Sequence, residues 1–293
     1  MSGASASAPP IISNILHPSD FSDASQVAFA HALKAALISK SILTLVHVAQ
    51  PSETAEWGDF PGVRETLERW GLLPPGSRKS AVPKLGIDVK KYVGHDTDPV
   101  RSVMHYLDGH PTDVIVLATS QHEGRMRWLR KSVAEPIARK SGQMTLFVPA
   151  GVPGFISFQD GSVSLKNILI PVADAPEPQP AVTAAARIVR QLGCPAGTFT
   201  LLHVGGPGPI DKLYRPDVPG WTWQTKTPSG EVTSRILEAA DEIDADLIVM
   251  STAGRHGFLD ALRGSHSEQV LHRAACPLLA VPEHSLAADA MRM

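Results

Sequence analysis

The residues best suited to chemistry lie in one glycine-containing loop near the end of the chain. Gly254 and Gly264 are separated by nine residues, and Ser265 and Ser267 follow at the expected start of a helix. Glycines let backbone N–H groups approach an anion closely, and the first turn of a helix offers unpaired N–H donors. The two hydroxyl groups add further donors. This combination suits phosphate binding, and it equally suits a plain turn followed by a helix cap.

An earlier segment repeats this loop and its surroundings. The apolar run Asp113–Thr119 returns as Asp246–Thr252, and Ser132 returns as Ser265, each pair 133 positions apart. A gapless match across a strand, a loop and a helix start is typical of a duplicated supersecondary unit. The chain therefore contains two copies of one unit, and the positions where the copies differ bear on function.

The two copies carry different parts of a ligand site. In the first copy Gln121 and Lys131 replace the two glycines, and a side chain at a position that needs positive φ costs about 1 kcal/mol. That loop is rich in arginine, which either compensates for the lost N–H contacts or faces solvent. The second copy keeps the glycines but has Ala173 where the first copy has Asp20, and Asp174 follows one residue later. We expect the second copy to be the binding one.

Alternating strand-like and helix-like segments are the elements that must position these loops. In the first half we expect strands at 11–19, 42–48, 86–93, 114–119 and 144–148, and helices at 24–38, 53–70, 98–107 and 133–140. In the second half we expect strands at 167–172, 200–204, 220–226, 247–250 and 277–281, and helices at 180–192, 230–243 and 267–275. Segments 73–83 and 205–220 are expected to be loops.

Such alternation predicts parallel sheets with right-handed crossovers, and short all-apolar strands predict helices on both faces. We therefore expect two tandem, doubly wound α/β domains, each with a five-stranded parallel sheet, at residues 11–150 and 165–283. Ligands bind such sheets beyond the carboxyl ends of the strands, near the point where the strand order reverses. The loops after the first and fourth strands are thus the expected site.

The motifs resemble those of universal stress proteins. Gly-x9-Gly-Ser after a fourth strand is similar to that family's nucleotide-binding signature, with Ser251 in place of a further glycine. The segment Ile15–Ser22 resembles the family's opening loop, and Thr44–Val48 and Thr200–Val204 resemble its second strand. Cys276–Pro282 resembles its fifth strand. The resemblance spans both halves and implies an adenine nucleotide alpha hydrolase-like fold in each.

The resemblance also implies an adenine-nucleotide site, with ATP as the expected ligand, with or without Mg²⁺. In the second copy the expected binding residues are Pro171, Asp174, Val204, Ser251, Gly254, Gly264, Ser265 and Ser267. In the first copy the corresponding, less favoured residues are Asp20, Val48 and Ser132. The histidines at matching second-strand positions, His47 and His203, are interpreted as packing residues rather than catalytic ones.

Pairing of the two halves is a further expectation from the resemblance. Family members usually dimerise through the fifth strand, so strands 144–148 and 277–281 are expected to meet within this molecule as a pseudo-twofold pair. Such pairing protects both strand edges. Whether the chain forms a homodimer in addition is left open.

Composition narrows the function classes. The chain has 293 residues with 43% hydrophobic and 19% charged content and a net charge of −2, which gives no bulk attraction to nucleic acid or anionic membranes. The two cysteines, Cys194 and Cys276, form no disulfide framework, which favours the cytoplasm. No apolar run approaches the length of a membrane helix.

The resulting hypothesis is a cytoplasmic stress-response protein that binds ATP as a regulatory ligand, whose bound state is recognised by an unidentified protein partner. The alternative is a protein-interaction scaffold of the same fold that has lost nucleotide binding. An enzyme, at most a slow ATPase, ranks last, because no general base, nucleophile or metal-ligand set accompanies the glycine loop.

Overall fold

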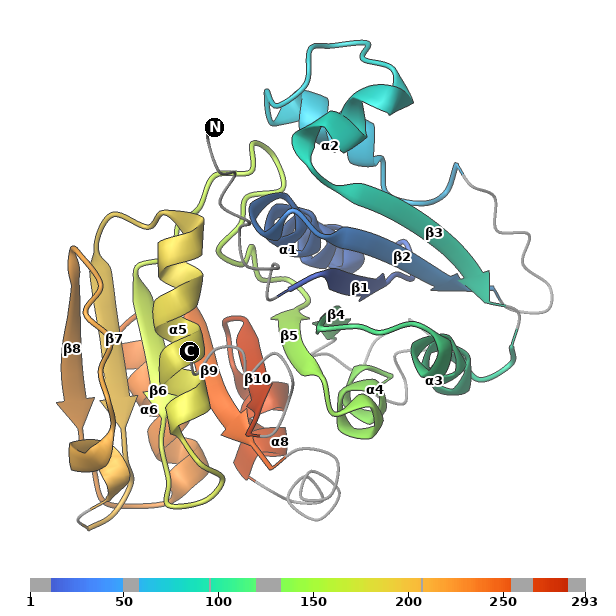
Figure 1. Ribbon diagram of the computed structural model, residues 1–293. Coiled ribbons are helices and arrows are strands. Elements are labelled where there is room, and N and C mark those ends of the chain that lie inside the picture. The colour runs from blue at the N-terminus through green and yellow to red at the C-terminus, as the bar shows by residue number, and fades with distance from the viewer. Residues whose placement is uncertain are drawn as a thin grey trace, which may run out of the picture.

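The strands of the chain form one continuous sheet across the molecule (Figure 1). The computed structural model describes residues 12–49, 58–94, 96–119, 133–206, 208–253 and 266–283. The first half contributes β1 (Asn14–Pro18), β2 (Ile42–Val48), β3 (Asp88–Gly94), β4 (Val114–Thr119) and β5 (Met144–Pro149). The second half contributes β6 (Asn167–Pro171), β7 (Gly197–Leu202), β8 (Trp221–Lys226), β9 (Leu247–Thr252) and β10 (Leu278–Pro282).

The two halves of the sheet share one topology and meet at their fifth strands. The strand order is β3-β2-β1-β4-β5-β10-β9-β6-β7-β8, and the second half mirrors the first. Every neighbouring pair is parallel except β5 and β10, which are antiparallel with Leu279 opposite Leu146. The doubly wound fold class and the pairing of the fifth strands are thus confirmed. The strand order reverses between β1 and β4 and between β6 and β9.

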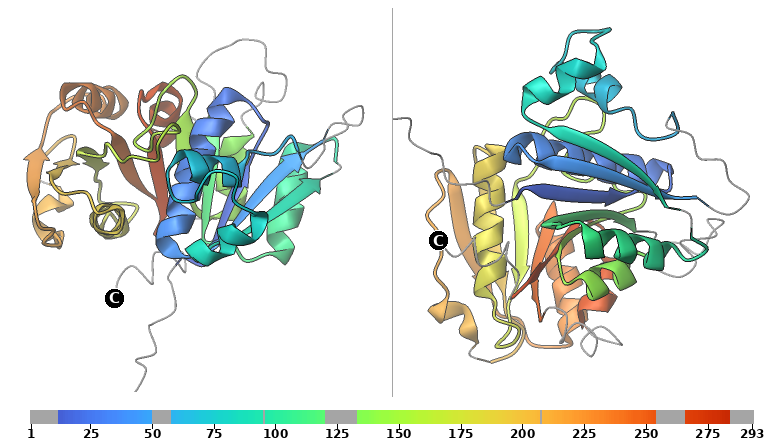
Figure 2. Two further views of the ribbon diagram at one scale, coloured as in Figure 1. Left: turned by 90° about the horizontal axis from the view of Figure 1, so that it is seen from above. Right: turned by 45° about the vertical axis from the view of Figure 1, so that its right-hand side comes forward.

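Helices cover both faces of the sheet (Figure 2). One face packs against α1 (Asp23–Ser39) and α5 (Gln179–Leu192). The other face packs against α3 (Pro99–Gly109), α4 (Ala134–Ser141), α6 (Val232–Glu242) and α8 (His266–Arg273). Neighbouring residues of one strand serve opposite cores, since Ile15 packs on the α1 side and Leu16 on the α3 side. Burial of each such side chain contributes about 1.5–3 kcal/mol.

Element boundaries differ most from the sequence expectation at α2, at the two expected loops and at β7. The helix α2 (Val63–Arg69) starts only after Pro61 and Gly62, and residues 51–57 lie outside the described part of the chain. The expected loops 73–83 and 205–220 contain the 3₁₀ helices η1 (Lys79–Leu85) and η2 (Pro209–Lys212). Strand β7 spans 197–202 rather than 200–204, because its pairing with β8 begins at Gly197 opposite Trp221. Within the described residues no helix combines the length and the apolar character that a bilayer crossing requires.

One aspartate in each half fixes the start of the half's first strand. Asp113 Oδ2 accepts hydrogen bonds from the backbone N–H groups of Ser13 and Asn14, at 2.7 and 2.9 Å. In the second half Asp246 Oδ2 accepts from Lys166 and Asn167, at 2.7 and 2.8 Å. Hydrogen bonds to an ionised acceptor are stronger than neutral ones. The repeated aspartate therefore ties the fourth strand to the first in both halves.

Replacing either aspartate by alanine removes the acceptor for two backbone donors. We expect Asp113→Ala and Asp246→Ala each to lower the free energy of unfolding by about 1–3 kcal/mol, measured by urea denaturation. Asp108→Ala is the control, because Asp108 is exposed on α3. Losses no greater than that of the control would contradict the assigned role.

A connecting segment, residues 151–166, joins the halves and packs on α1 and α2. His31 Nδ1 donates to the Val27 carbonyl oxygen at 2.8 Å, so its Nε2 is left to accept from the N–H groups of Phe155 and Ile156, at 3.1 and 3.2 Å. Burial lowers the pKa of His31 to about 4, which keeps the ring neutral and able to accept. The Phe158 carbonyl oxygen in turn accepts from Trp70 Nε1 at 3.1 Å.

The approach of this segment to His31 requires a glycine at position 154. A Cβ atom there would lie 2.3 Å from His31 Cε1, and the backbone φ is +68°. We expect Gly154→Ala to lower the free energy of unfolding by at least about 2 kcal/mol. Gly151→Ala is the matched control, because Gly151 has φ +80° with nothing within 4 Å of its Cβ position, and should cost about 1 kcal/mol. Equal losses in urea denaturation would rule out the contact with His31 as the cause.

Candidate functional site

The carboxyl ends of the strands form two separate edges. Because β5 and β10 are antiparallel, the carboxyl ends of the first half and those of the second half lie at opposite ends of this central pair. Each half therefore has its own position for a ligand. The two positions are chemically different, and each is described below.

In the second half a cavity of about 180 Å³ opens at the carboxyl ends of β6, β7 and β9, beside the start of α6. It lies at the reversal of strand order between β6 and β9, the usual ligand position in this class of fold. Its lining residues are mostly apolar: Pro171, Val172, Ala173, Ala175, Pro176, Pro178, Leu202, His203, Val204, Val232, Ile236, Met250 and Ser251. Apolar walls with few polar groups are typical of small-molecule sites.

Ser251 supplies the clearest polar group of this cavity. Its Oγ is buried, and it has no hydrogen-bond partner within the described residues. A buried hydroxyl group without a partner costs free energy, and a ligand atom placed against it would remove that cost. Ser251 stands on β9 opposite Val281 of β10, so the hydroxyl is carried by a paired strand.

The backbone around the cavity is held by a histidine. His203 Nδ1 donates to the Val172 carbonyl oxygen at 2.9 Å, and the Val172 N–H donates to the Leu202 carbonyl oxygen at 2.8 Å. These bonds fasten the residues after β6 to the residues after β7. In the first half His47 Nδ1 makes the same bond to the Ser19 carbonyl oxygen, at 2.8 Å. Both histidines thus have a structural contact, in agreement with their interpretation as packing residues.

The start of α6 faces the cavity but its N–H donors are engaged. Glu231 accepts from the N–H groups of Thr233 and Ser234, at 2.9 and 2.7 Å. These backbone bonds, that of Ser234 foremost, lower the pKa of Glu231 to about 2. A carboxylate at this position occupies the donors that a phosphate would use. The phosphate groups of a ligand would therefore need donors from another element.

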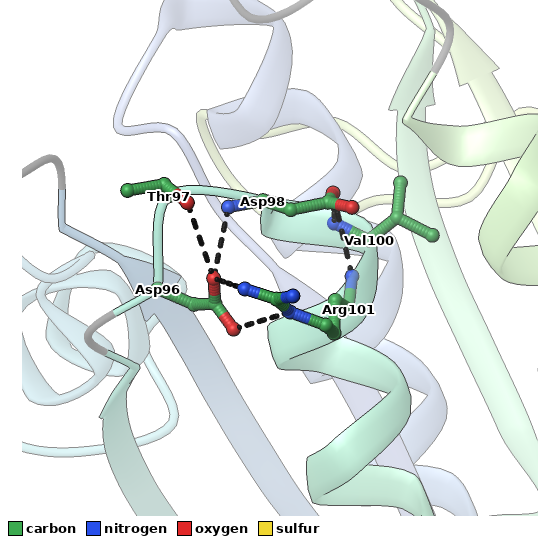
Figure 3. Close-up of polar contacts among 5 residues, drawn as sticks. All are labelled: Asp96, Thr97, Asp98, Val100 and Arg101. Atoms are coloured by element: carbon green, nitrogen blue, oxygen red, sulfur yellow. Dashed lines mark hydrogen bonds and ion pairs between the residues drawn. The ribbon is translucent and has the colours of Figure 1, made fainter.

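The backbone N–H donors at the start of α3 in the first half are engaged in the same way (Figure 3). Asp98 Oδ1 accepts from the N–H groups of Val100 and Arg101, at 3.0 and 3.4 Å. Asp96 accepts from both Arg101 Nε and Arg101 Nη2, at 2.9 and 2.7 Å, and this guanidinium holds the pKa of the Asp96 carboxyl well below its usual range. Both halves thus cap this helix with their own carboxylates. An acidic residue just before a helix is the sequence signal for such a cap.

The position after β1 in the first half is occupied by an aromatic side chain. Phe21, at φ +62°, stacks on the His47 ring with 4.0 Å between centroids, and its edge contact with Phe60 is 5.3 Å. The Asp20 carboxylate accepts from the N–H of Ser22 at 3.1 Å and from the hydroxyl of Ser25. This carboxylate therefore bonds within its own loop, and the Phe21 ring covers the end of β2.

In the second half the residue that corresponds to Phe21 is Asp174, which is exposed and lies outside the cavity lining. The absence of an aromatic ring at that position leaves the end of β7 accessible. The cavity of the second half thus opens where the first half packs three rings: Phe21, His47 and Phe60. The sequence points to Asp20 and Asp174 through their charge and gives no signal for the position of the Phe21 ring.

The predicted binding residues fall into three groups. Pro171, Val204 and Ser251 line the cavity together. Asp174 is exposed beside it, while Asp20 is half-buried and Val48 is buried in the first half. Four predicted residues lie outside the described part of the chain: Ser132, Gly254, Gly264 and Ser265. Ser267 lies on α8, but its side chain is outside the described part. The sequence does not identify apolar lining residues such as Val232, Ile236 and Met250, because their pattern is that of ordinary core residues of a helix or strand.

Comparison with known proteins shows which family the sequence of this chain matches. Residues 12–149 and 215–282 match the model of the universal stress protein family. A segment of 55 residues is 47% identical to Universal stress protein A homolog 1 of Coxiella burnetii and covers 19% of this chain and 38% of that protein. A universal stress protein of Methanocaldococcus jannaschii is 42% identical over 57 residues, 20% of this chain and 34% of that protein. The matched segments thus span well under half of these curated relatives.

Solved structures share the fold of the whole chain. A universal stress protein from Archaeoglobus fulgidus superposes with a TM-score of 0.59 at 18% identity, covering 93% of this chain and 99% of that one. A protein of unknown function from Pseudomonas aeruginosa PAO1 gives 0.60 at 14% identity, covering 96% of each. At these identities the likeness establishes the fold alone. Because the two family segments cover more than half of its residues, the chain belongs to the universal stress protein family, as a tandem member.

Proposed function

We propose that the second half of this protein, residues 165–283, binds an adenine nucleotide as a regulatory ligand, with ATP the first compound to test. The cavity at the ends of β6, β7 and β9 carries the proposal, since it joins apolar walls to the buried hydroxyl of Ser251. An adenine ring has the flat apolar faces and polar edge that such a cavity accommodates. We expect the loop that contains Gly254 and Gly264 to bind the phosphate groups.

In this proposal the first half, residues 11–150, does not bind a nucleotide. Phe21 covers the end of β2 by stacking on His47, and the Asp20 carboxylate is engaged by Ser22 and Ser25. A ligand would have to displace the Phe21 ring from His47 before it could occupy this position. One nucleotide per chain is therefore the expected stoichiometry. A cytoplasmic location, a protein partner that recognises the bound state, and Mg²⁺ as a companion of ATP stay predictions.

A non-binding scaffold is the second candidate, and one observation favours it. Glu231 occupies the N–H donors at the start of α6, so the described part of the cavity offers few donors to a triphosphate. Under this alternative the family fold is retained for protein contacts alone. Titration with nucleotide separates the two functions.

The first experiment is calorimetric titration of the full chain with ATP. We expect one site with micromolar affinity, about −8 kcal/mol. Gly264→Lys, which copies the residue at position 131 of the first half, should abolish binding, and Asp20→Ala in the first half should leave it unchanged. Loss of binding in Asp20→Ala with retention in Gly264→Lys would place the nucleotide in the first half. No binding by the wild-type protein would favour the scaffold.

A second experiment uses the difference between Phe21 and Asp174. We expect Asp174→Phe to weaken ATP binding at least tenfold, because a large ring beside the cavity would obstruct its entrance. Asp174→Ala is the matched control and should change affinity less than about threefold, since the Asp174 carboxylate lies outside the lining. Comparable losses in both variants would show that the carboxylate itself binds the ligand.

A further inference from the structure

The sheet ends in the first half at β3, and a cleft lies beside this strand. β3 is the last strand of the strand order, and α2 lies near its start (Figure 1). The connection from β2 to β3, residues 49–87, contains α2 and η1, whereas residues 203–220 suffice to join β7 to β8. A cleft of about 680 Å³ lies between α2, η1 and β3, and we call it the edge cleft. The longer connection of the first half therefore builds one side of the edge cleft.

Alternate residues of β3 turn their backbone groups away from the sheet. The Asp88 N–H donates to the Ser41 carbonyl oxygen at 3.4 Å, so the backbone of Asp88 faces β2. Backbone groups of successive strand residues point to opposite sides, so those of Val89 and Val93 point away from β2. No described strand pairs with this side of β3. Such an edge is a template for a further extended segment.

The edge cleft can accept apolar side chains of a segment paired with β3. Phe60, Val63 and Val82 line it and are buried, and Val89 of β3 lines it as well. Alternate side chains of a strand lie on one face, so an added strand would direct every second side chain to the face of the sheet that carries Val89. The edge cleft therefore favours an apolar residue at alternate positions of such a segment.

The chain around the edge cleft is basic. Residues 78–91 contain five cations and one acid, a net charge of +4, whereas the whole chain has a net charge of −2. Arg64 and Glu65 also line the edge cleft, and they pair with each other at 2.5 Å. Four cations of residues 78–91 are exposed and form no ion pair with another described residue: Arg78, Lys79, Lys84 and Lys90.

This charge selects among the possible occupants of the edge. Pairing of β3 with β3 of a second copy would bring the lysines at positions 90 and 91 close to their own counterparts, and like charges across a strand pair are destabilising. Lysines on an edge strand commonly prevent such self-association. An acidic segment meets the opposite condition, because its carboxylates complement the lysines.

We propose that the edge of β3 binds an extended acidic segment of a partner protein as an added strand, with alternate apolar side chains in the edge cleft. The outward backbone groups of Val89 and Val93 supply the pairing, and the carboxylates of the segment lie on its other face, beside Lys90. The edge cleft shares no lining residue with the cavity at the ends of β6, β7 and β9, so this proposal is independent of nucleotide binding.

The test is fluorescence anisotropy of the full chain with labelled nine-residue peptides. A peptide that alternates valine and glutamate should bind at least about tenfold more tightly than peptides with lysine for glutamate or serine for valine. Lys90→Glu should weaken the valine–glutamate peptide at least about fivefold. Lys212→Glu makes the same charge change on η2 of the second half and should alter the affinity less than about twofold. Equal losses in the two variants would show attraction by net charge alone and overturn the proposal.

Methylation of the peptide nitrogens tests the strand pairing itself. Only alternate N–H groups of an added strand point at β3, so methylation of one series, either the valines or the glutamates, should abolish binding. Methylation of the other series should change the affinity less than about threefold. Equal effects of the two series overturn the proposal. Undetectable binding of the unmethylated peptide at about 1 mM overturns it as well.

Discussion

The antiparallel pairing of β5 with β10 is the contact on which the rest of the structure depends. A parallel five-stranded sheet on its own leaves the edge of its fifth strand open, and two such edges in one chain satisfy each other. The pairing places the two sets of carboxyl ends apart, so each half has a separate ligand position. It also leaves the centre of one face between α1 and α5, where a cavity of about 100 Å³ lies.

Duplication has preserved the contacts that build the fold and changed those that shape the ligand positions. Asp113 and Asp246 tie the fourth strand to the first, and His47 and His203 tie the ends of the first two strands. One such change lies just after the first strand, where Phe21 packs on His47 and its counterpart Asp174 faces solvent. The first half thus has an aromatic ring over the end of β2, while the second half has a cavity at the ends of β6, β7 and β9.

The fold could be predicted from the sequence, because strands and helices are indicated by local patterns of apolar residues. The apolar runs 42–48 and 114–119 coincide with β2 and β4. The pairing of β5 with β10 was expected from the resemblance to universal stress proteins. The sequence did not show which of the two ligand positions is open. Charge drew attention to Asp20, yet the direction of the Phe21 side chain decides whether that position is open, and this direction depends on packing against Phe60, far along the chain. The start of α6 shows the same limit, because its N–H donors are engaged by Glu231.

Hydrogen–deuterium exchange of the full chain, with and without saturating ATP, tests the central claim most directly, since it locates a ligand by the backbone it protects. Binding in the second half predicts slower exchange in residues 171–176, 203–206 and 251–253, with residues 18–22 and 47–49 unchanged. Protection confined to the first-half segments, or none in either half, would contradict the assignment of the nucleotide to the β6–β7–β9 cavity.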